Sequence, residues 1–120
     1  MPVKSSTSSV LKWPNAEVVI KFLKQWAEKI ALNNPDVLKI GFFGSYARGN
    51  WGVGSDLDVI LILKHCEKPF ERRGLLFDTL SFPVPVDLLV YTQEEWRKLL
   101  EEKGFAENIK KEIIWIYSRQ

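Results

Sequence analysis

The chain has 120 residues, of which 46% are hydrophobic, so it is long enough and apolar enough to build one core. Its 17 basic and 15 acidic residues give a formal net charge of +2, which excludes the strong basic excess typical of general nucleic-acid-binding proteins. The single cysteine, Cys66, excludes a disulfide within the chain, and no apolar run is long enough to span a bilayer. We therefore expect one cytoplasmic domain without membrane contact.

The first part of the chain predicts a tail followed by a helix. Residues 1–14 are rich in serine and show no hydrophobic periodicity, so we expect a flexible tail there and a folded domain over residues 15–120. Asn15 is a candidate N-cap, and residues 33–35, Asn-Asn-Pro, should end the helix. Apolar residues recur between them at helical spacing: Val19, Phe22, Leu23, Trp26 and Ile30. This spacing predicts an amphipathic helix that packs on a flat surface.

Two strands follow, joined by a glycine-rich connection. Residues 37–43 and 56–63 have the branched and apolar composition of strands, and the second should be buried on both faces beyond Val59. The connection holds four glycines, Gly44, Gly49, Gly52 and Gly54. Residues 69–80 then predict a helix that begins at Pro69, with Phe70, Arg73, Phe77 and Leu80 on one face. The adjacent arginines, Arg72 and Arg73, are typical of a solvated surface.

The last third of the chain predicts another strand, two helices and a closing strand. Two prolines precede a strand over residues 86–91, and Thr92 with Glu95 forms a capping box for a helix from residue 93 to about 103, ending at Gly104. A short helix and a strand over the run 113–117 would follow, although a helical stripe also fits this segment. The order of elements predicts an α/β domain around one mixed sheet of about four to five strands, flanked by helices.

Three aspartates form the most informative pattern. Asp56 and Asp58 are two positions apart at the start of a strand, so their side chains share a face and their stems lie roughly 6 to 7 Å apart. Asp87 interrupts an otherwise apolar strand, where a charge needs a partner. If the two strands are neighbours, the three carboxylates meet, and an all-oxygen ligand set favours magnesium or manganese over zinc. Taken singly, each aspartate could instead cap a turn, face solvent or mark a sheet edge.

The connection after the first strand predicts an anion site. Gly44 allows backbone N–H groups to approach a ligand, and Ser45 and Arg48 share one face of the helical turn that follows. Arg48 could add positive charge toward a phosphate or hold a nearby carboxylate. The alternative is an ordinary strand–helix turn with a salt-bridging arginine, because glycines are common in turns.

These residues together resemble a known family. The run GSYARG at 44–49, followed by DLDV at 56–59 and VDL at 86–88, resembles the minimal nucleotidyltransferase family of the polymerase-beta-like superfamily. The resemblance implies that fold, and it implies transfer of a nucleoside monophosphate from an NTP, with ATP as the expected substrate. It also implies two Mg²⁺ ions, replaceable by Mn²⁺, on the catalytic residues Asp56, Asp58 and Asp87. Phosphate-binding positions are implied at Gly44 and Ser45, with Arg48 and Ser55 in support.

The acceptor of the nucleotide is a separate question. Because the chain is short, we expect another protein to provide the acceptor site, and the resemblance implies a HEPN-type toxin whose tyrosine is adenylylated, with this chain as the antitoxin. One alternative is transfer to a small hydroxylated molecule such as an aminoglycoside, in a pocket that a homo-oligomer completes. A further alternative is an antitoxin that neutralises its partner by binding alone, without catalysis.

Overall fold

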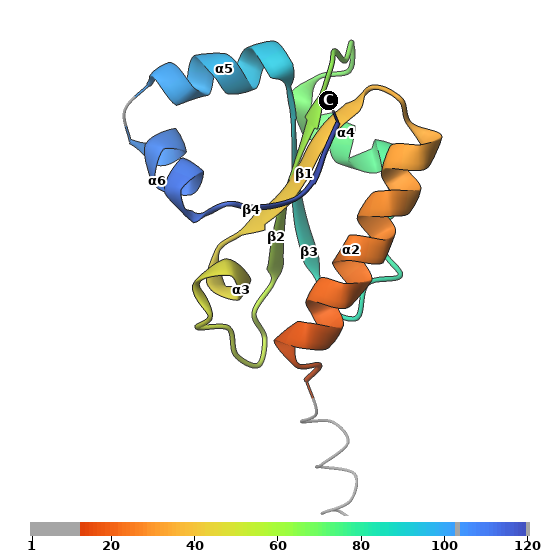
Figure 1. Cartoon of the computed structure of the whole chain (residues 1–120), viewed down its shortest axis with the longest axis vertical. Helices are drawn as coiled ribbons and strands as arrows, with labels where there is room; N and C mark the ends of the chain where they lie inside the picture. The colour runs from red at the N-terminus through yellow and green to blue at the C-terminus, as the bar shows by residue number, and fades with distance from the viewer. Residues whose placement is uncertain (1–12, 103, 120) are drawn as a thin grey trace, which may run out of the picture.

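The computed structural model describes residues 13–102 and 104–119, which form a helix-flanked, four-stranded mixed sheet (Figure 1). The strands are β1 (Val37–Phe43), β2 (Leu57–Leu63), β3 (Val86–Thr92) and β4 (Ile114–Ser118). Their order across the sheet is β3-β2-β1-β4, in which β1 runs antiparallel to β2 and β4 while β2 and β3 are parallel. The predicted α/β domain with a mixed sheet is confirmed. Residues 1–12 of the predicted tail lie outside the described residues.

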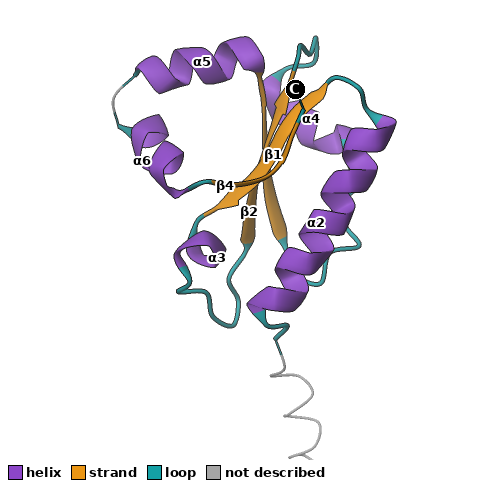
Figure 2. Ribbon diagram, viewed as in Figure 1, coloured by secondary structure: helices purple, strands orange, loops and turns teal. Residues whose placement is uncertain are grey.

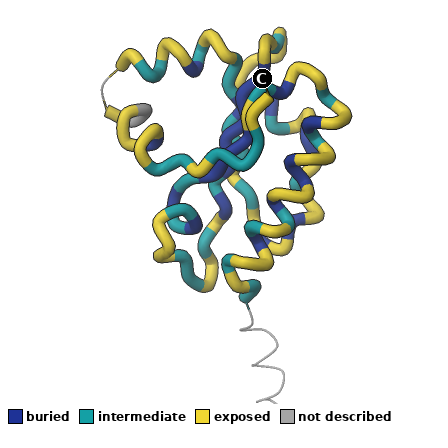
Figure 3. Tube along the Cα trace, viewed as in Figure 1, coloured by how far each residue is buried: buried dark blue, intermediate teal, exposed yellow. Residues whose placement is uncertain are grey.

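Helix α2 (Ala16–Asn33) covers one face of the sheet, and α5 (Gln93–Glu101) and α6 (Phe105–Glu112) lie on the other side (Figures 1 and 2). The Asn15 side chain accepts a hydrogen bond of 3.0 Å from the N–H of Val18, as the N-cap prediction requires. The helix buries Val19, Leu23, Trp26, Ala27 and Ala31. Figure 3 shows that the central strands β1 and β2 are largely buried, while the outward positions of the helices are exposed.

The alternation of side chains along β2 divides the core in two. Leu57, Val59, Leu61 and Leu63 pack in the cluster that includes α2. Ile60 and Ile62 pack instead with Trp96 of α5 and Ile109 of α6. Asp58 has the same parity as Ile60, so it belongs to the face of the sheet that α5 and α6 cover. The strand pattern therefore fixes the side of the sheet on which the carboxylate stands.

The helix predicted over residues 69–80 is shorter in the structure. Helix α4 (Phe70–Arg73) is followed by one 3₁₀ turn, η1 (Gly74–Leu76), and the backbone of Phe77 is extended. The Asp78 side chain accepts a hydrogen bond of 2.9 Å from Leu80 N–H, and this local turn replaces helical hydrogen bonding. The prediction was therefore wrong for residues 77–80, and Leu80 is 94% exposed instead of facing the protein.

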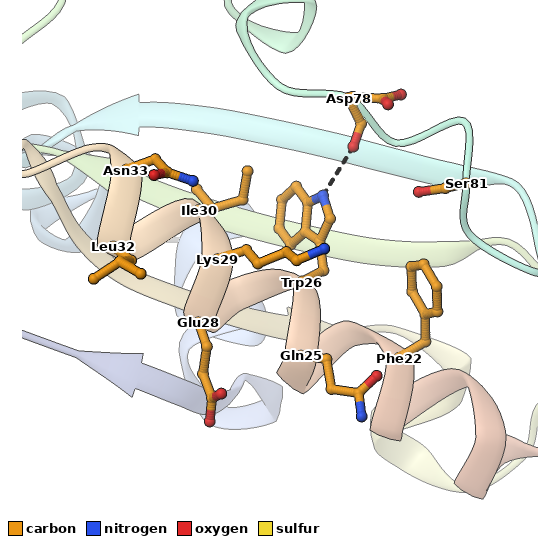
Figure 4. Close-up of a pocket in the computed structure, with 10 residues that line it drawn as sticks. All are labelled: Phe22, Gln25, Trp26, Glu28, Lys29, Ile30, Leu32, Asn33, Asp78 and Ser81. Atoms are coloured by element: carbon orange, nitrogen blue, oxygen red, sulfur yellow. Dashed lines mark hydrogen bonds between the residues drawn. The ribbon is translucent and has the colours of Figure 1, made fainter.

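The segment after η1 is fastened to α2. Trp26 Nε1 donates a hydrogen bond of 2.8 Å to the carbonyl oxygen of Asp78 (Figure 4). Phe82 packs edge-to-face on Phe22 and Trp26, with ring centroids 4.7 and 5.3 Å away. A cavity of about 670 Å³ remains between α2 and this segment. The contacts explain how residues 77–82 pack on α2 without being helical.

The C-terminal third follows the predicted order. Thr92 and Glu95 make the predicted capping box at the start of α5, which ends at Glu101, before the predicted end at residue 103. Gly104 is the N-cap of α6 rather than the end of α5, and its φ of 108° is suited to glycine. The short helix and closing strand are both present as α6 and β4. No helix within residues 13–102 and 104–119 is long and apolar enough to cross a membrane.

Arg73 is buried, so the prediction of a solvated arginine pair was wrong for this residue. It is 5% exposed and donates to the carbonyl oxygens of Lys68 and Val90 at 2.8 and 3.2 Å. Its guanidinium also bonds both carboxylate oxygens of Glu95, and the Nη2–Oε2 distance is 3.1 Å. Hydrogen bonding from Arg73 holds the pKa of Glu95 below its usual value. This bidentate pair connects α4 to the start of α5.

Candidate active site

The predicted site residues gather at one end of the sheet. Because β2 and β3 are parallel and β1 is antiparallel to them, the N-terminal ends of β2 and β3 meet the C-terminal end of β1. Asp58 is the register partner of both Phe43 and Asp87. Gly44 follows Phe43 directly. The structure thus brings the glycine connection and two of the three aspartates together.

Asp58 and Asp87 form an in-register pair of like charges. Both have the parity of the sheet face that α5 and α6 cover, so their carboxylates project on the same side. Asp58 is half-buried and Asp87 is exposed. Burial raises the pKa of Asp58, and the negative charges of Asp87 and Asp56 raise it further. The arrangement is unfavourable by itself and would be relieved by a bound cation.

Asp56 lies just outside the strand, one position before β2, and is exposed. Its charge acts on Asp58, but no three His, Cys, Asp or Glu side chains among the described residues already form a metal-binding group. The pair Asp58–Asp87 suits a hard divalent cation because its donors are all carboxylate oxygens. Joint ligation by all three aspartates therefore stays a prediction. His65 and Cys66 follow the opposite end of β2.

Gly44 is required at its position by a close approach to Asp58. Its φ is 78°, and a Cβ at this residue would collide with Oδ2 of Asp58. The glycine thus allows the carboxylate to lie directly against the backbone of the connection. Ser45 begins α3 (Ser45–Arg48) beside this contact and is half-buried. The structure thus places Gly44 against the Asp58 carboxylate with Ser45 as the next residue, and phosphate binding by the two stays a prediction.

Glu112, which was not predicted as a site residue, accepts hydrogen bonds from two donors of this connection. Its Oε1 accepts hydrogen bonds from Gly44 N–H at 2.6 Å and from Arg48 Nη1 at 2.8 Å. Arg48 is therefore the salt-bridging arginine of the alternative interpretation, although it also lies beside the aspartates and lowers the pKa of Asp58. The only sequence feature that points to Glu112 is its position directly before residues 113–117, the predicted closing strand. Its neighbours follow from the pairing of β4 with β1.

Ser55 is engaged inside the connection itself. Its Oγ accepts a hydrogen bond of 2.9 Å from Gly52 N–H, and its own N–H donates to the Gly52 carbonyl at 3.0 Å. These bonds close the turn that leads into Asp56. The rings of Tyr46 and Trp51 stack nearby, with centroids 5.8 Å apart and an interplanar angle of 8°. The connection is thus held by its own side chains as well as by Glu112.

Comparison with known proteins identifies the family. The family model described as "Nucleotidyltransferase domain" matches residues 19–116. A Methanocaldococcus jannaschii protein named as a candidate protein adenylyltransferase is 27% identical over 73 residues, which cover 60% of this chain and 74% of that protein. The matched segment includes β1, β2, β3, the site residues and the first part of β4.

Two solved structures share the fold. A candidate nucleotidyltransferase from Sulfolobus solfataricus superposes with a TM-score of 0.65 and 22% identity, covering 87% of this chain and 84% of that one. A toxin–antitoxin structure with AMP-PNP gives a TM-score of 0.52 and 19% identity, covering 81% and 74% of the two chains. Members of the matched family generally use a nucleoside triphosphate and a divalent metal. The chain belongs to the nucleotidyltransferase domain family and is a nucleotidyltransferase enzyme.

Proposed function

We propose that this enzyme transfers AMP from ATP to a tyrosine hydroxyl of a HEPN-type toxin and thereby acts as its antitoxin. The observation that carries the proposed chemistry is the in-register pair Asp58–Asp87 beside Gly44, because two like charges held there favour a bound divalent cation next to the connection that we propose binds phosphate. Residues 15–120 would act as a single catalytic domain.

Each site residue has a distinct role in this proposal. Asp58 and Asp87, with Asp56 beside them, would hold two Mg²⁺ ions, for which Mn²⁺ could substitute. The ions would supply positive charge for the triphosphate and for the pyrophosphate that leaves. Gly44 and Ser45 would bind the distal phosphates through N–H and hydroxyl groups. Arg48 and Ser55 would support them, Arg48 by charge and Ser55 by shaping the turn before Asp56.

The proposed transfer step begins at Asp87. Asp87 is exposed, so it can be reached by an acceptor hydroxyl from outside the chain and can take its proton. The acceptor oxygen then forms a bond to the α-phosphorus of ATP, and the bond from that phosphorus to the pyrophosphate oxygen breaks. The products are AMP esterified to the acceptor and free pyrophosphate.

The choice of a protein acceptor is supported by two comparisons and one resemblance. The M. jannaschii relative is named as a candidate protein adenylyltransferase, and one structural neighbour is a toxin–antitoxin assembly with AMP-PNP. The HEPN type of the toxin rests on the resemblance of the sequence to minimal nucleotidyltransferases. No observation favours a small-molecule acceptor over a protein.

The test uses ATP labelled at either the α- or the γ-phosphate. The purified enzyme and the product of the neighbouring gene are incubated with each substrate and Mg²⁺, and the labelled residue is identified by mass spectrometry. Tyrosine labelling of the neighbour from α-labelled ATP alone is the expected result. Labelling from γ-labelled ATP would indicate phosphoryl transfer instead. Tight binding of the two proteins without any label would contradict the proposal and favour neutralisation by binding.

A further inference from the structure

Glu112 places a carboxylate where the proposed function needs a phosphate. It is the last residue of α6, and its Oε1 accepts from Gly44 N–H at 2.6 Å and from Arg48 Nη1 at 2.8 Å. Both donors belong to the connection between β1 and β2. The pair of contacts shows that this connection can bind an anionic oxygen, because it already binds one.

A phosphate oxygen and a carboxylate oxygen compete for the same donors. The Gly44 N–H and the Arg48 Nη1–H both point at Oε1 of Glu112, so neither can donate to another acceptor at the same time. We propose that Glu112 is an internal competitor at the phosphate-binding part of the site, which the triphosphate displaces on binding and which thereby weakens nucleotide affinity. This inference rests on the proposed function, since it concerns the same donors.

The surroundings of Glu112 allow this exchange. Its side chain is 24% exposed, so the carboxylate borders solvent and can leave its partners by side-chain rotation. Ile109, one turn earlier on α6, is only 7% exposed and packs with Ile60, Ile62 and Trp96, so the helix can stay in place. Arg48 is half-exposed on the other side of the pair. The contact therefore connects two groups that are both accessible to an incoming ligand.

Charge also favours the exchange. Glu112 adds a negative charge close to Asp58, whose carboxylate already lies near those of Asp56 and Asp87. Mg²⁺ that arrives with a triphosphate offsets part of its negative charge, whereas the Glu112 carboxylate has no cation to offset its charge near the aspartates. Departure of Glu112 removes one like charge from the site as the nucleotide enters. The contact with Arg48 and Gly44 thus satisfies the donors only while the site is empty of nucleotide.

A purely structural role for Glu112 predicts the opposite change in nucleotide affinity when Glu112 is removed. If Glu112 served to hold Arg48 in place for the nucleotide, its removal would release Arg48 and weaken binding. If Glu112 competes, its removal frees both donors and strengthens binding. The direction of the change in affinity therefore distinguishes the two roles.

The experiment measures the dissociation constant of Mg²⁺–AMP-PNP by calorimetry for the native protein, Glu112→Gln and Glu112→Ala. Because the pair is partly exposed, we expect both variants to bind about two- to fivefold more tightly than the native protein. Glu107→Gln is the matched control, since Glu107 is an exposed acid on the same helix and makes the same change of charge. Its affinity should equal that of the native protein.

A second measurement follows the Gly44 amide by NMR and does not depend on affinity. We expect the Gly44 resonance to move when Mg²⁺–AMP-PNP is added to the native protein, and to have already moved in unliganded Glu112→Ala. Equal or weaker binding by both variants would overturn the inference while leaving the proposed function intact. A folded native protein that binds no Mg²⁺–AMP-PNP would instead contradict the proposed function itself.

Discussion

The two ends of the sheet treat charged side chains in opposite ways. At the C-terminal ends of β2 and β3, buried Arg73 is matched by Glu95, and Arg119 donates to the carbonyl oxygens of Val37 and Ala31 at 3.1 and 2.9 Å. At the N-terminal ends, Asp58 faces a carboxylate of the same sign, Asp87, in register. One end pairs its buried charge, whereas the other, beside the Arg48–Glu112 ion pair, leaves two like charges side by side. Such an imbalance is stable only if the fold compensates for it elsewhere, and it indicates a site for a ligand.

The largest expected effect comes from removing charge at the N-terminal end. Asp58→Asn should lower the rate of AMP transfer by about 10³-fold or more, since loss of charge stabilisation at a metal-assisted centre costs several kcal/mol of transition-state stabilisation. The rate is measured with α-labelled ATP on protein whose fold is checked by circular dichroism. Asp36→Asn is the control, because Asp36 is exposed and precedes β1 at the opposite end. A comparable loss in Asp36→Asn would remove the distinction between the two ends.

At the C-terminal end the same kind of change should affect stability and not chemistry. Glu95→Gln leaves the buried Arg73 guanidinium without its charged partner and weakens the capping box of α5. We expect a loss of about 3 kcal/mol in the free energy of unfolding, at the lower end of the range for buried pairs because the Glu95 side chain is 43% exposed.

Denaturant unfolding provides this measurement. The neighbouring substitution Glu94→Gln removes only an exposed pair with Lys98 at 3.5 Å and should change stability by less than about 0.5 kcal/mol. The transfer rate per folded molecule should remain that of the native protein in both variants. Equal stability of the two variants would show that the buried ion pair contributes nothing to the difference between the ends.

Alanine substitutions of two glycines should have a smaller effect, and they separate backbone strain from displacement of the Asp58 carboxylate. Gly44→Ala and Gly54→Ala both place a side chain at a positive φ, 78° and 88°, and each should cost about 1–2 kcal/mol of stability. Only the alanine at position 44 meets Oδ2 of Asp58, whereas a Cβ at position 54 has no neighbour within 4 Å. Thermal unfolding should therefore show destabilisation of both variants, the larger in Gly44→Ala because of this added contact, and transfer assays should show a loss of rate in Gly44→Ala alone. Equal rates would disprove the steric coupling to Asp58.

The smallest expected effect is a dependence of stability on pH. The pKa of Asp58 is raised in the folded state above its ordinary value of 3.8, so the folded protein binds this proton more tightly than the unfolded chain does. The destabilisation caused by the charged Asp58 carboxylate is complete above the raised pKa and disappears below the pKa that Asp58 has in the unfolded chain. Asp58→Asn should thus have a higher melting temperature than the native protein at neutral pH, and the difference should shrink as the pH falls through that interval. A difference that is independent of pH would contradict the raised pKa.

The local pattern of the sequence was sufficient for most of the fold and for the aspartate pair. Helical spacing placed α2, the capping box placed the start of α5, and alternation along β2 placed Asp58 on the face that α5 and α6 cover, whereas Asp56 lies one position before the strand. These predictions depend on contacts between residues close in sequence. The crossover over residues 64–85, which makes β2 and β3 parallel neighbours, then brings Asp87 beside Asp58.

The features that were missed depend on contacts between distant residues. Glu112 reaches Gly44 across 68 positions, and its place follows from the pairing of β4 with β1. Arg73 has the local sequence of a surface arginine, and its burial depends on an ion pair with Glu95, 22 positions later. The turn at Asp78 replaced a helix because a side-chain hydrogen bond and the Trp26 contact favoured it over the apolar spacing. The helix or strand propensity of a short stretch of sequence contains no information about partners so far away in the chain.

The most direct test of the account asks whether the like-charged end of the sheet binds a divalent cation. Binding of Mn²⁺ in the presence of AMP-PNP is measured by electron paramagnetic resonance for the native protein and for Asp58→Asn. We expect the native protein to bind Mn²⁺ and the variant to bind it at least about tenfold more weakly, because a ligand oxygen has lost its charge. Equal Mn²⁺ affinity in the two proteins would show that the pair Asp58–Asp87 is not a metal site, and it would contradict the account.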